Sequence, residues 1–495
     1  MKTKAFLKTL SLFLALTSLL GVLIACAKPE GPGTETKSPS QTDAPEETKV
    51  TANLPDLDLD GYLYSVAHWY VNGWESRRNV DIYAEAPNAD PINDAVYNRN
   101  TRLTEKYNFE IEYTETEHTE LASKVRQLIN TSDDIYDVVY LLLSGAPPFI
   151  TGGSLLDFET NFEYCDYDQP YWDNAVREAL SFADHTYLMA SSYNIIDEDA
   201  TAAVAFNKDI AANENLPSFY EFVNKGEWTF ETFYDMMTSF DGDENGDMKM
   251  KEEDDTFGFL GGVDVTSTFF YGGGGKLTEK DEYDLPEYVF NTEENIDLIT
   301  RVFDIMYDET FINSHKYNAS YYNNFIAGHG LFYWSRMEKV VQLRGEEAID
   351  FGILPTPKRD EYQPEHLSML SEHMTGLPAV LSSETDPDTV SYIMEAMAAG
   401  SYYDLQKAYY DVTLKTKSAR DDESQDMLDI IFKNRILDLG ELCQFGLFSN
   451  DLLYYPNQVG NYAIVSKYES VESKIQKDIE KFIEAVDKID EQRGM

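Results

Sequence analysis

One acidic loop in this chain has the residue types and the spacing of a calcium-binding loop. In DGDENGDMKMKE, residues 241–252, side chains with oxygen atoms stand at positions 1, 3, 5 and 12, and a glycine stands at position 6. This is the pattern of the twelve-residue EF-hand loop. The expected ligands are the side chains of Asp241, Asp243, Asn245 and Glu252 and the backbone carbonyl of Asp247.

Two features separate this loop from a calcium sensor. Lys249 stands at position 9, where a liganding or water-holding side chain is usual. The segment that follows, DDTFGF, is typical of a strand rather than of a second EF-hand helix, and the chain has one such loop rather than a pair. We therefore expect a structural Ca²⁺ clip, with a solvated acidic turn as the alternative, and no catalytic cofactor.

Motifs that would indicate catalysis are missing from the sequence. The glycines at 272–275 precede Lys276, but Phe270 and Leu277 replace residues that a phosphate-binding P-loop requires. There is no G-x-S-x-G, H-E-x-x-H or C-x-x-C pattern. Cys165 and Cys443 are expected to be unpaired buried thiols, and a disulfide between them stays open. We expect no enzyme.

The charge of the chain excludes one class of partner. Its formal net charge is −50 at pH 7. A surface this acidic repels phosphate groups, so we expect no nucleic-acid binding and a neutral or cationic ligand.

The N-terminus has the composition of a secretory signal. Three lysines precede an apolar run over residues 10–25. The run ends in LIAC, which looks like a bacterial lipobox whose cysteine, Cys26, is lipidated. We therefore expect a lipoprotein signal peptide over residues 1–25, and a transmembrane anchor is the alternative.

The residues after Cys26 are expected to form a tether. Residues 27–49 are rich in Pro, Gly, Ser and Thr and nearly lack large apolar side chains, so they cannot build a core. We expect the lipidated cysteine and the disordered tether to span residues 26–57. They would hold a folded body at the extracellular face of the cell membrane by the lipid alone, and the long tether favours a Gram-positive cell.

Strand and helix patterns alternate in the first part of the body. Residues 62–69, 109–115 and 135–143 are typical of strands, and residues 91–108 and 120–130 have helical spacing. This order predicts a parallel sheet with crossover helices.

A second set of patterns follows. It predicts a strand leading into a helix over 201–211 and a helix over 227–240 that Thr229 caps. Further strands are expected at 329–334 and 350–357, and further helices at 293–309, 386–403, 423–437 and 468–489.

Four stretches carry a family resemblance. They are NRNTRLTEKYNFEIE; AFNKDI followed by GEWTFETF; FIAGHGLFYWSRM with DFGILPTPKRDEYQ; and YYDVTLKTKSARDDESQDMLDII. In this order, and together with the lipobox, they resemble the family 1 extracellular solute-binding proteins of ABC importers, which include sugar-binding lipoproteins. The resemblance covers about residues 58–490.

The resemblance implies an α/β fold of the type II periplasmic-binding-protein kind, with two lobes, a cleft and hinge crossings. It places residues 58–190 and about 372–420 in the first lobe, and about 191–371 and 421–495 in the second. Ligands in open parallel sheets bind beyond the carboxyl ends of the strands, and hinge closure around a ligand is a known motion of binding proteins.

Ligand-binding candidates follow from sugar chemistry. A sugar ring offers an apolar face to an aromatic plane and hydroxyl groups to carboxylates, amides and guanidinium groups. Residues of these types next to predicted strands or lobe crossings are Trp69, Tyr70, Trp74, Ser144, Tyr193, Asn194, Trp334, Arg336, Glu372 and His373. Ordinary core packing is the alternative for each of them.

The expected function is that of a monomeric, lipid-anchored substrate-binding component of an ABC importer. It would bind a carbohydrate between its lobes and deliver it to the permease. The sequence leaves the sugar open. A peptide or another small solute as ligand, a surface hydrolase acting on glycans, and an adhesin are the alternatives.

Overall fold

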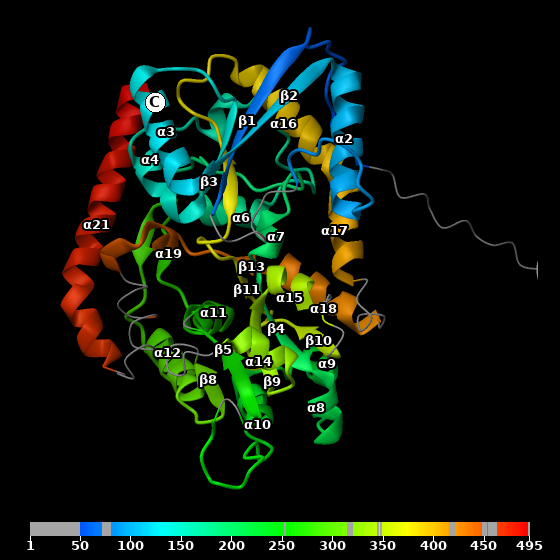
Figure 1. Ribbon diagram of the computed structural model, residues 1–495. Helices are drawn as coiled ribbons and strands as arrows, with labels where there is room; N and C mark the ends of the chain where they lie inside the picture. The colour runs from blue at the N-terminus through cyan, green and yellow to red at the C-terminus, as the bar shows by residue number, and fades with distance from the viewer. Residues whose placement is uncertain are drawn as a thin grey trace, which may run out of the picture. The chain divides into compact units, whose positions relative to one another are not determined.

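Two β-sheets surrounded by helices make up the body of this protein in the computed structural model (Figure 1). The structure describes residues 50–71, 81–251, 254–262, 264–313, 320–343, 346, 349–414, 422–447, 453 and 463–493. All of these residues belong to one compact unit, residues 50–495.

The first sheet has the strand order β12-β3-β1-β2. Its strands are β1 (Tyr62–Tyr70), β2 (Phe109–Glu117), β3 (Val138–Leu142) and β12 (Gly376–Ala379). β1 pairs in parallel with both β2 and β3, and β12 pairs antiparallel with β3. The predicted parallel arrangement of the first three strands is confirmed, and β12 joins them from a distant part of the chain.

The second sheet has the order β10-β4-β9-β5-β8. Its strands are β4 (Ala202–Asn207), β5 (Phe257–Gly261), β8 (Phe311–Asn313), β9 (Gly330–Arg336) and β10 (Phe351–Leu354). β5 pairs in parallel with β8 and β9, β4 pairs antiparallel with β9, and β10 pairs antiparallel with β4.

Both sheets share one arrangement of four strands. Read from the edge, β2-β1-β3-β12 corresponds to β8-β5-β9-β4, with three parallel strands followed by one antiparallel strand in each case. β10 extends the second sheet by one strand. We call the first sheet with its helices the first lobe, and the second sheet with its helices the second lobe.

Helices begin where the sequence supplies a cap. α2 (Pro91–Tyr107) starts after Asp90, whose side chain accepts the backbone N–H groups of Ile92 and Asn93. Thr229 caps α10 (Phe230–Met237) as predicted. Asp386 caps α16 (Pro387–Tyr402), which has a proline in its first turn. These local signals explain why the predicted starts of these helices are confirmed.

Several other helices cover the sheets. In the first lobe these are α3 (His118–Thr131), η2 (Leu143–Gly145), α4 (Pro147–Thr151), α5 (Phe158–Asn161) and α6 (Asn174–Leu180). After α7 (Ile196–Asp199) the chain enters the second lobe, which holds α8 (Lys208–Asn213), α9 (Phe219–Lys225), α11 (Asp264–Gly272), α12 (Glu293–Met306), α14 (Tyr321–Ile326) and α15 (Met337–Leu343).

The chain crosses between the lobes more than once. It enters the second lobe between α7 and β4 and returns between β11 (Ser368–Met369) and β12. α17 (Leu405–Leu414) packs on α2 and α15, so it contacts both lobes. α18 (Asp422–Lys433) then packs on β10.

The last part of the chain also contacts both lobes. Strand β13 (Arg435–Ile436) pairs in parallel with β11, and it replaces the end of a helix that the sequence predicts to continue to residue 437. α19 (Leu439–Cys443), η3 (Phe445–Leu447) and the long helix α21 (Ile464–Arg493) follow. α21 packs on α4 of the first lobe and on β7 (Pro286–Tyr288), which pairs with β6 (Thr278–Lys280). In Figure 1 it runs along one edge of the molecule.

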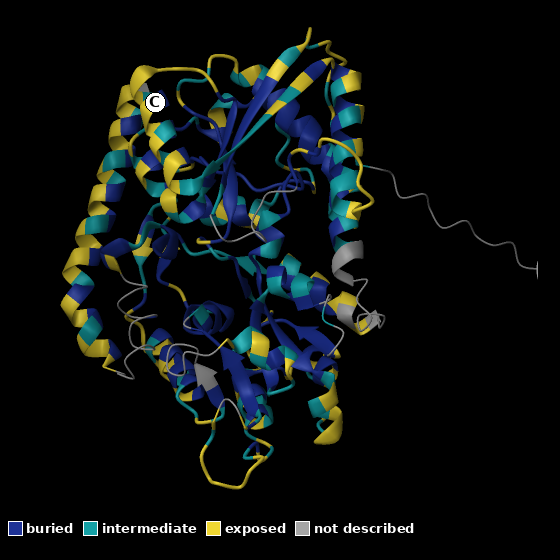
Figure 2. Cartoon of the chain, viewed as in Figure 1, coloured by how far each residue is buried: buried dark blue, intermediate teal, exposed yellow. Residues whose placement is uncertain are grey.

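The sheets form the cores of the lobes. Figure 2 shows β4, β5, β9 and β10 and the middle of the first sheet as buried, whereas α21 and α2 expose one side and bury the other. Val66, Val139, Phe259 and Phe332 have no exposed surface. Cys165 and Cys443 are free thiols. Among the described helices, none combines the length and apolar character needed to cross a membrane.

Candidate functional site

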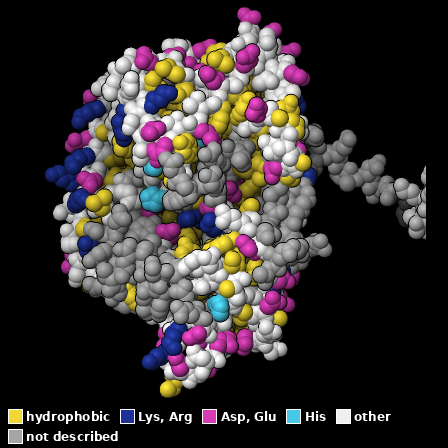
Figure 3. Space-filling view, viewed as in Figure 1, with side chains coloured by type: hydrophobic (Ala, Val, Ile, Leu, Met, Phe, Trp, Pro, Cys, Tyr) yellow, Lys and Arg dark blue, Asp and Glu magenta, His cyan; other side chains and the backbone are white. Residues whose placement is uncertain are grey.

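A cavity of about 580 Å³ lies between the two sheets, and we call it the interlobe cavity. Residues from both lobes and from two crossings line it. In Figure 3, histidine, basic and acidic side chains gather in the middle of the face shown.

The first lobe meets this cavity at the carboxyl ends of its parallel strands. Val71 follows β1, His118 follows β2, Leu142 ends β3 and Ser144 comes two residues later. The carboxyl edge of a parallel sheet is where α/β folds bind ligands.

The second lobe meets the cavity in the same way. Arg336 ends β9, and Asp264 begins α11 shortly after β5. Ser267 and Thr268 lie on the first turns of α11. The corresponding strands of both lobes therefore direct their carboxyl ends at the same cavity.

Trp334, Arg336 and Asp264 form a connected group on the second-lobe wall. The Trp334 Nε1 donates a hydrogen bond of 3.1 Å to the Thr268 hydroxyl, which fixes the plane of the indole. The Arg336 guanidinium carbon lies 5.3 Å from the centre of the Trp334 ring. The Arg336 Nη1 donates to Asp264 Oδ2 at 3.2 Å. This wall presents an aromatic ring beside a donor and an acceptor for hydroxyl groups.

The crossing before β12 supplies the third side of the cavity. Ser371, His373 and Met374 line it. The backbone of this crossing is held to the first lobe, because Ser144 N donates to Glu372 O at 2.9 Å and Leu143 N donates to Thr375 O at 2.9 Å.

Glu372 lies beneath the cavity wall with 1% of its surface exposed. Burial opposes its ionisation and the Asp264 charge adds to this, so the pKa of Glu372 is raised to about 7. Its Oε1 lies 3.2 Å from the His373 Nε2. The Glu372 carboxyl group therefore lies next to His373 and within electrostatic range of Asp264, two residues of the cavity wall.

The predicted ligand-binding residues divide into groups. Ser144, Trp334, Arg336 and His373 come together on the wall of the interlobe cavity. Glu372 is buried beside them. Tyr70 is half-buried at the end of β1, and Trp74 lies outside the described residues.

Three predicted residues lie elsewhere in the first lobe. Trp69, the last residue of the strand expected over 62–69, belongs to β1, which pairs with β2 as far as Tyr70. It lines a second cavity that adjoins the first. Tyr193 and Asn194 are buried in the first-lobe core, where the Tyr193 carbonyl accepts a hydrogen bond from Arg99.

Several cavity residues are absent from the sequence-based candidates. His118, Asp264, Ser267, Thr268 and Ser371 line the interlobe cavity as well. His118 and Asp264 each follow a segment that the sequence predicts as a strand. Their position at a strand end was therefore a usable signal, and the emphasis on aromatic side chains missed them.

The acidic loop is held by its own backbone in this structure. The Asp243 carboxylate accepts the backbone N–H groups of Gly246, Asp247 and Met248, and the Asp247 carboxylate pairs with Lys251. Among the described residues, no three acidic, histidine or cysteine side chains are grouped as metal ligands. Glu252 lies outside the described residues, so the full ligand set remains a prediction.

Comparisons with known proteins establish the fold. No family model and no curated sequence matches the chain. Among solved structures, the sugar-binding protein MalE from Xanthomonas citri matches with a TM-score of 0.56 at 12% identity, over 85% of this chain and 98% of that one.

Other solved structures match over similar lengths. A cyclo/maltodextrin-binding protein complexed with maltotetraose has a TM-score of 0.54 at 11% identity, over 87% of this chain and 99% of that one. UgpB from Mycobacterium tuberculosis, in complex with glycerophosphocholine, has a TM-score of 0.55 at 12% identity, over 84% and 98%. The chain therefore has the two-lobe, type II fold of the periplasmic solute-binding proteins.

Proposed function

We propose that this protein is the substrate-binding component of an ABC importer and that it holds a carbohydrate in the interlobe cavity. The observation that carries this proposal is the meeting of parallel strands from both sheets at one cavity with an oriented tryptophan and several hydroxyl-binding side chains. The structural neighbours named above for sugars and maltotetraose support the same ligand class.

The mechanism is binding without covalent chemistry. Trp334 stacks on the apolar face of a sugar ring, while Asp264 and Arg336 bind its hydroxyl groups from the second lobe. Ser144 and His118 bind the same ligand from the first lobe. Because both lobes touch the ligand, its binding favours their closed arrangement, which the permease then recognises.

The anchor belongs to the same proposal. Cys26 and the residues up to 49 lie outside the described residues. Lipidation of Cys26 would hold the body at the extracellular face of the cell membrane, where the permease takes up the ligand.

Hydrolysis is disfavoured by the side chains of the cavity. Glycosidases use two carboxyl groups on either side of the scissile bond. Among the described residues that line the cavity, Asp264 is the single carboxylate, and Arg336 binds it. A second candidate is a phosphorylated or other small solute, since one neighbour binds glycerophosphocholine.

A thermal-shift screen of the purified protein tests the proposal. The panel contains mono- and oligosaccharides, oligopeptides, polyamines and glycerophosphodiesters. A ligand at about 100 times its dissociation constant stabilises a protein by roughly 2.7 kcal/mol, which is readily measured. We expect a shift with one class of glycan. A shift with peptides, amines or phosphodiesters alone would overturn the carbohydrate assignment, and release of reducing ends from a glycan would indicate an enzyme.

A further inference from the structure

A second cavity of about 370 Å³ opens from the first lobe next to the interlobe cavity. The two cavities share His118, Leu142 and Ser144 as walls. We call this second cavity the side chamber. A ligand that extends past His118 therefore occupies both spaces.

The walls of the side chamber combine an aromatic surface with a positive charge. Trp69, Phe149 and Arg126 line it, and Arg126 lies on α3, the helix that starts at His118. The Arg126 guanidinium carbon lies 5.1 Å from the centre of the Phe149 ring, which orients the group along the chamber wall. Arg126 is otherwise exposed, so a ligand can reach it.

The charge of these walls differs from that of the whole protein. Among the described residues, no aspartate or glutamate lines the side chamber, and none forms an ion pair with Arg126. Within the interlobe cavity, Asp264 and Arg336 offset one another. His118 Nδ1 lies 2.6 Å from Glu117 Oε1, so these two groups also offset one another when His118 is protonated. Among the described residues that line the two cavities, Arg126 is the charged side chain for which no ion pair is present.

The position of Arg126, a cation without an ion-pair partner among the described residues, suggests what kind of ligand the side chamber accepts. The chain carries a formal charge of −50, and such a field repels anionic ligands. A carboxylate enters the cleft favourably only where a local positive charge offsets that field. A guanidinium group binds carboxylates through two parallel hydrogen bonds, which gives both energy and orientation.

We propose that Arg126 binds the carboxylate of a uronic acid unit in the side chamber, so that the ligand is an acidic oligosaccharide whose neighbouring unit lies against Trp334. This inference rests on the proposed function and narrows its substrate class. It also replaces the neutral or cationic ligand that the net charge of the chain predicts.

The test compares each acidic glycan with its own neutral form. Oligogalacturonides and oligomers of mannuronate and guluronate are titrated into the protein by calorimetry, before and after reduction of the carboxyl groups to primary alcohols. Sulfated oligosaccharides form a third arm. We expect at least one uronate oligomer to bind, and its reduced form to bind about 10-fold or more weakly, the range of a charged hydrogen bond.

Two variants assign the effect to Arg126. Arg126→Gln is expected to weaken uronate binding by about 10-fold or more and to weaken binding of the reduced glycan much less, because a glutamine amide still hydrogen-bonds an alcohol. Lys124→Gln removes the same unit charge from the same helix, from a side chain that contacts Tyr136 rather than either cavity. It should leave both affinities unchanged. Melting temperatures confirm that both variants fold.

The outcomes separate this inference from the proposed function. Binding of neutral glycans in preference to uronates, or equal uronate affinity in Arg126→Gln and the unaltered protein, would overturn the carboxylate assignment and leave sugar binding intact. Preference for sulfated over uronate oligomers would also overturn it. Failure of every glycan to bind would overturn the proposed function itself.

Discussion

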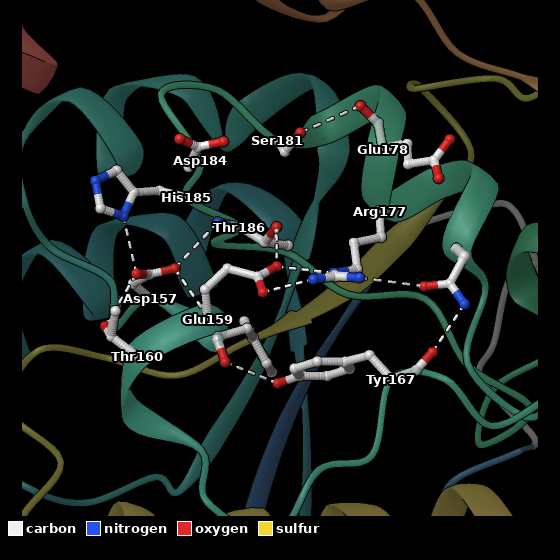
Figure 4. A network of polar contacts seen from close by, with 12 residues as sticks. Asp157, Glu159, Thr160, Tyr167, Arg177, Glu178, Ser181, Asp184, His185 and Thr186 are labelled. Carbon is white, nitrogen blue, oxygen red and sulfur yellow. Dashed lines mark hydrogen bonds and ion pairs between the residues drawn. The ribbon is translucent and has the colours of Figure 1, made fainter. Parts of the chain in front are cut away.

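The Nδ1 of His185 lies 2.9 Å from the Oδ2 of Asp157, a carboxylate with no exposed surface in the first lobe (Figure 4). On the other side of the ring, Nε2 lies 3.1 Å from Oδ1 of Asp490, which belongs to α21. One imidazole therefore joins the first lobe to the C-terminal helix. Both ring nitrogens donate hydrogen bonds only when the ring is protonated.

This arrangement predicts a dependence of stability on pH. The hydrogen bond to Asp157 and the nearby charges of Asp157 and Asp490 raise the pKa of His185 above its ordinary value. A raised pKa means that the folded state binds the proton more tightly than the unfolded state. The contribution of His185 is therefore complete below about pH 6.5 and is lost as the pH rises through the folded-state pKa.

The measurement is urea unfolding of the protein and of His185→Gln between about pH 5.5 and pH 8.5. We expect the variant to lose about 1 kcal/mol at the acidic end and less at the alkaline end. A constant difference between the two proteins at every pH would contradict the proton-linked role.

The buried Glu372 leads to a second prediction about the pH dependence of stability, this time at the wall of the interlobe cavity. Its pKa is raised to about 7 because burial opposes its negative charge. Burial stabilises the neutral form of Glu372 in the folded state, whereas the unfolded chain ionises it at its ordinary pKa. The wild-type protein therefore loses stability as the pH rises from the ordinary pKa of a glutamate through about 7. Glu372→Gln keeps the shape and removes the ionisation. We expect the stability of the variant relative to the wild type to be on the order of 1 kcal/mol greater at pH 8 than at about pH 4, where the carboxyl is neutral in both states. A loss of stability in the variant at pH 8 would show that the carboxylate is held in its charged form.

Gly376 on β12 predicts a packing effect. A Cβ atom at this position would lie 2.0 Å from Nε1 of the buried Trp69, so the indole would have to move. We expect Gly376→Ala to lower the free energy of unfolding by about 1–3 kcal/mol. Gly145→Ala is the matched control, because no atom lies within 4 Å of its added Cβ. Equal melting temperatures for the two variants would contradict this account.

For Trp334 we predict that substitution lowers glycan affinity more than it lowers the stability of the protein. Trp334→Phe keeps a ring on the cavity wall and removes the hydrogen bond to Thr268. We expect about 1 kcal/mol lower stability and about 10-fold weaker glycan binding. Trp228→Phe is the control, since Trp228 is fully buried in the second lobe and donates to the Pro355 carbonyl at 3.0 Å. It should lose similar stability and keep its affinity. Equal loss of affinity in both variants would indicate a general effect on the fold.

The acidic loop predicts a calcium effect on stability alone. If residues 241–252 bind Ca²⁺, the melting temperature in calcium exceeds that in chelator while the glycan preference stays the same. Asp241→Asn should abolish the difference, because the variant lacks the negative charge of this calcium ligand. The loop itself should keep its shape, since the amide oxygen still accepts the Asp243 backbone N–H. Equal melting temperatures of the wild type in calcium and in chelator would reject the clip.

The elements that local sequence signals control could be predicted. Thr229 caps the helix that it was expected to cap, α16 lies within the helix predicted over 386–403, and β1, β2 and β3 pair as the strand–helix alternation requires. The short strands β12 and β13 could not, because each depends on a partner from a distant part of the chain. Four- and two-residue segments carry too little periodicity to reveal such pairing.

The cavity residues divide for a similar reason. Trp334 and Arg336 were found because an aromatic and a basic side chain follow a clear strand pattern. Tyr193 and Asn194 satisfy the same chemical criteria, yet they are buried in the first-lobe core by segments that the sequence does not place beside them. Arg126 was missed because a single arginine on an exposed helix resembles ordinary surface charge, and its meaning depends on the chamber beside it.

The antiparallel strand β12, which completes the first sheet from a distant part of the chain, has a consequence for how the protein is made. β12 covers β3 in the first lobe, but it is synthesised only after every strand of the second sheet, more than two hundred residues after β3. Until then β3 is an open edge with unpaired backbone groups, the kind of surface that draws chains into aggregates. The nascent chain must therefore be kept from aggregating until residue 379 has emerged, and a fragment ending near residue 190 would expose that edge permanently. Export of the chain before folding would avoid the hazard, because the whole sheet is then available at once.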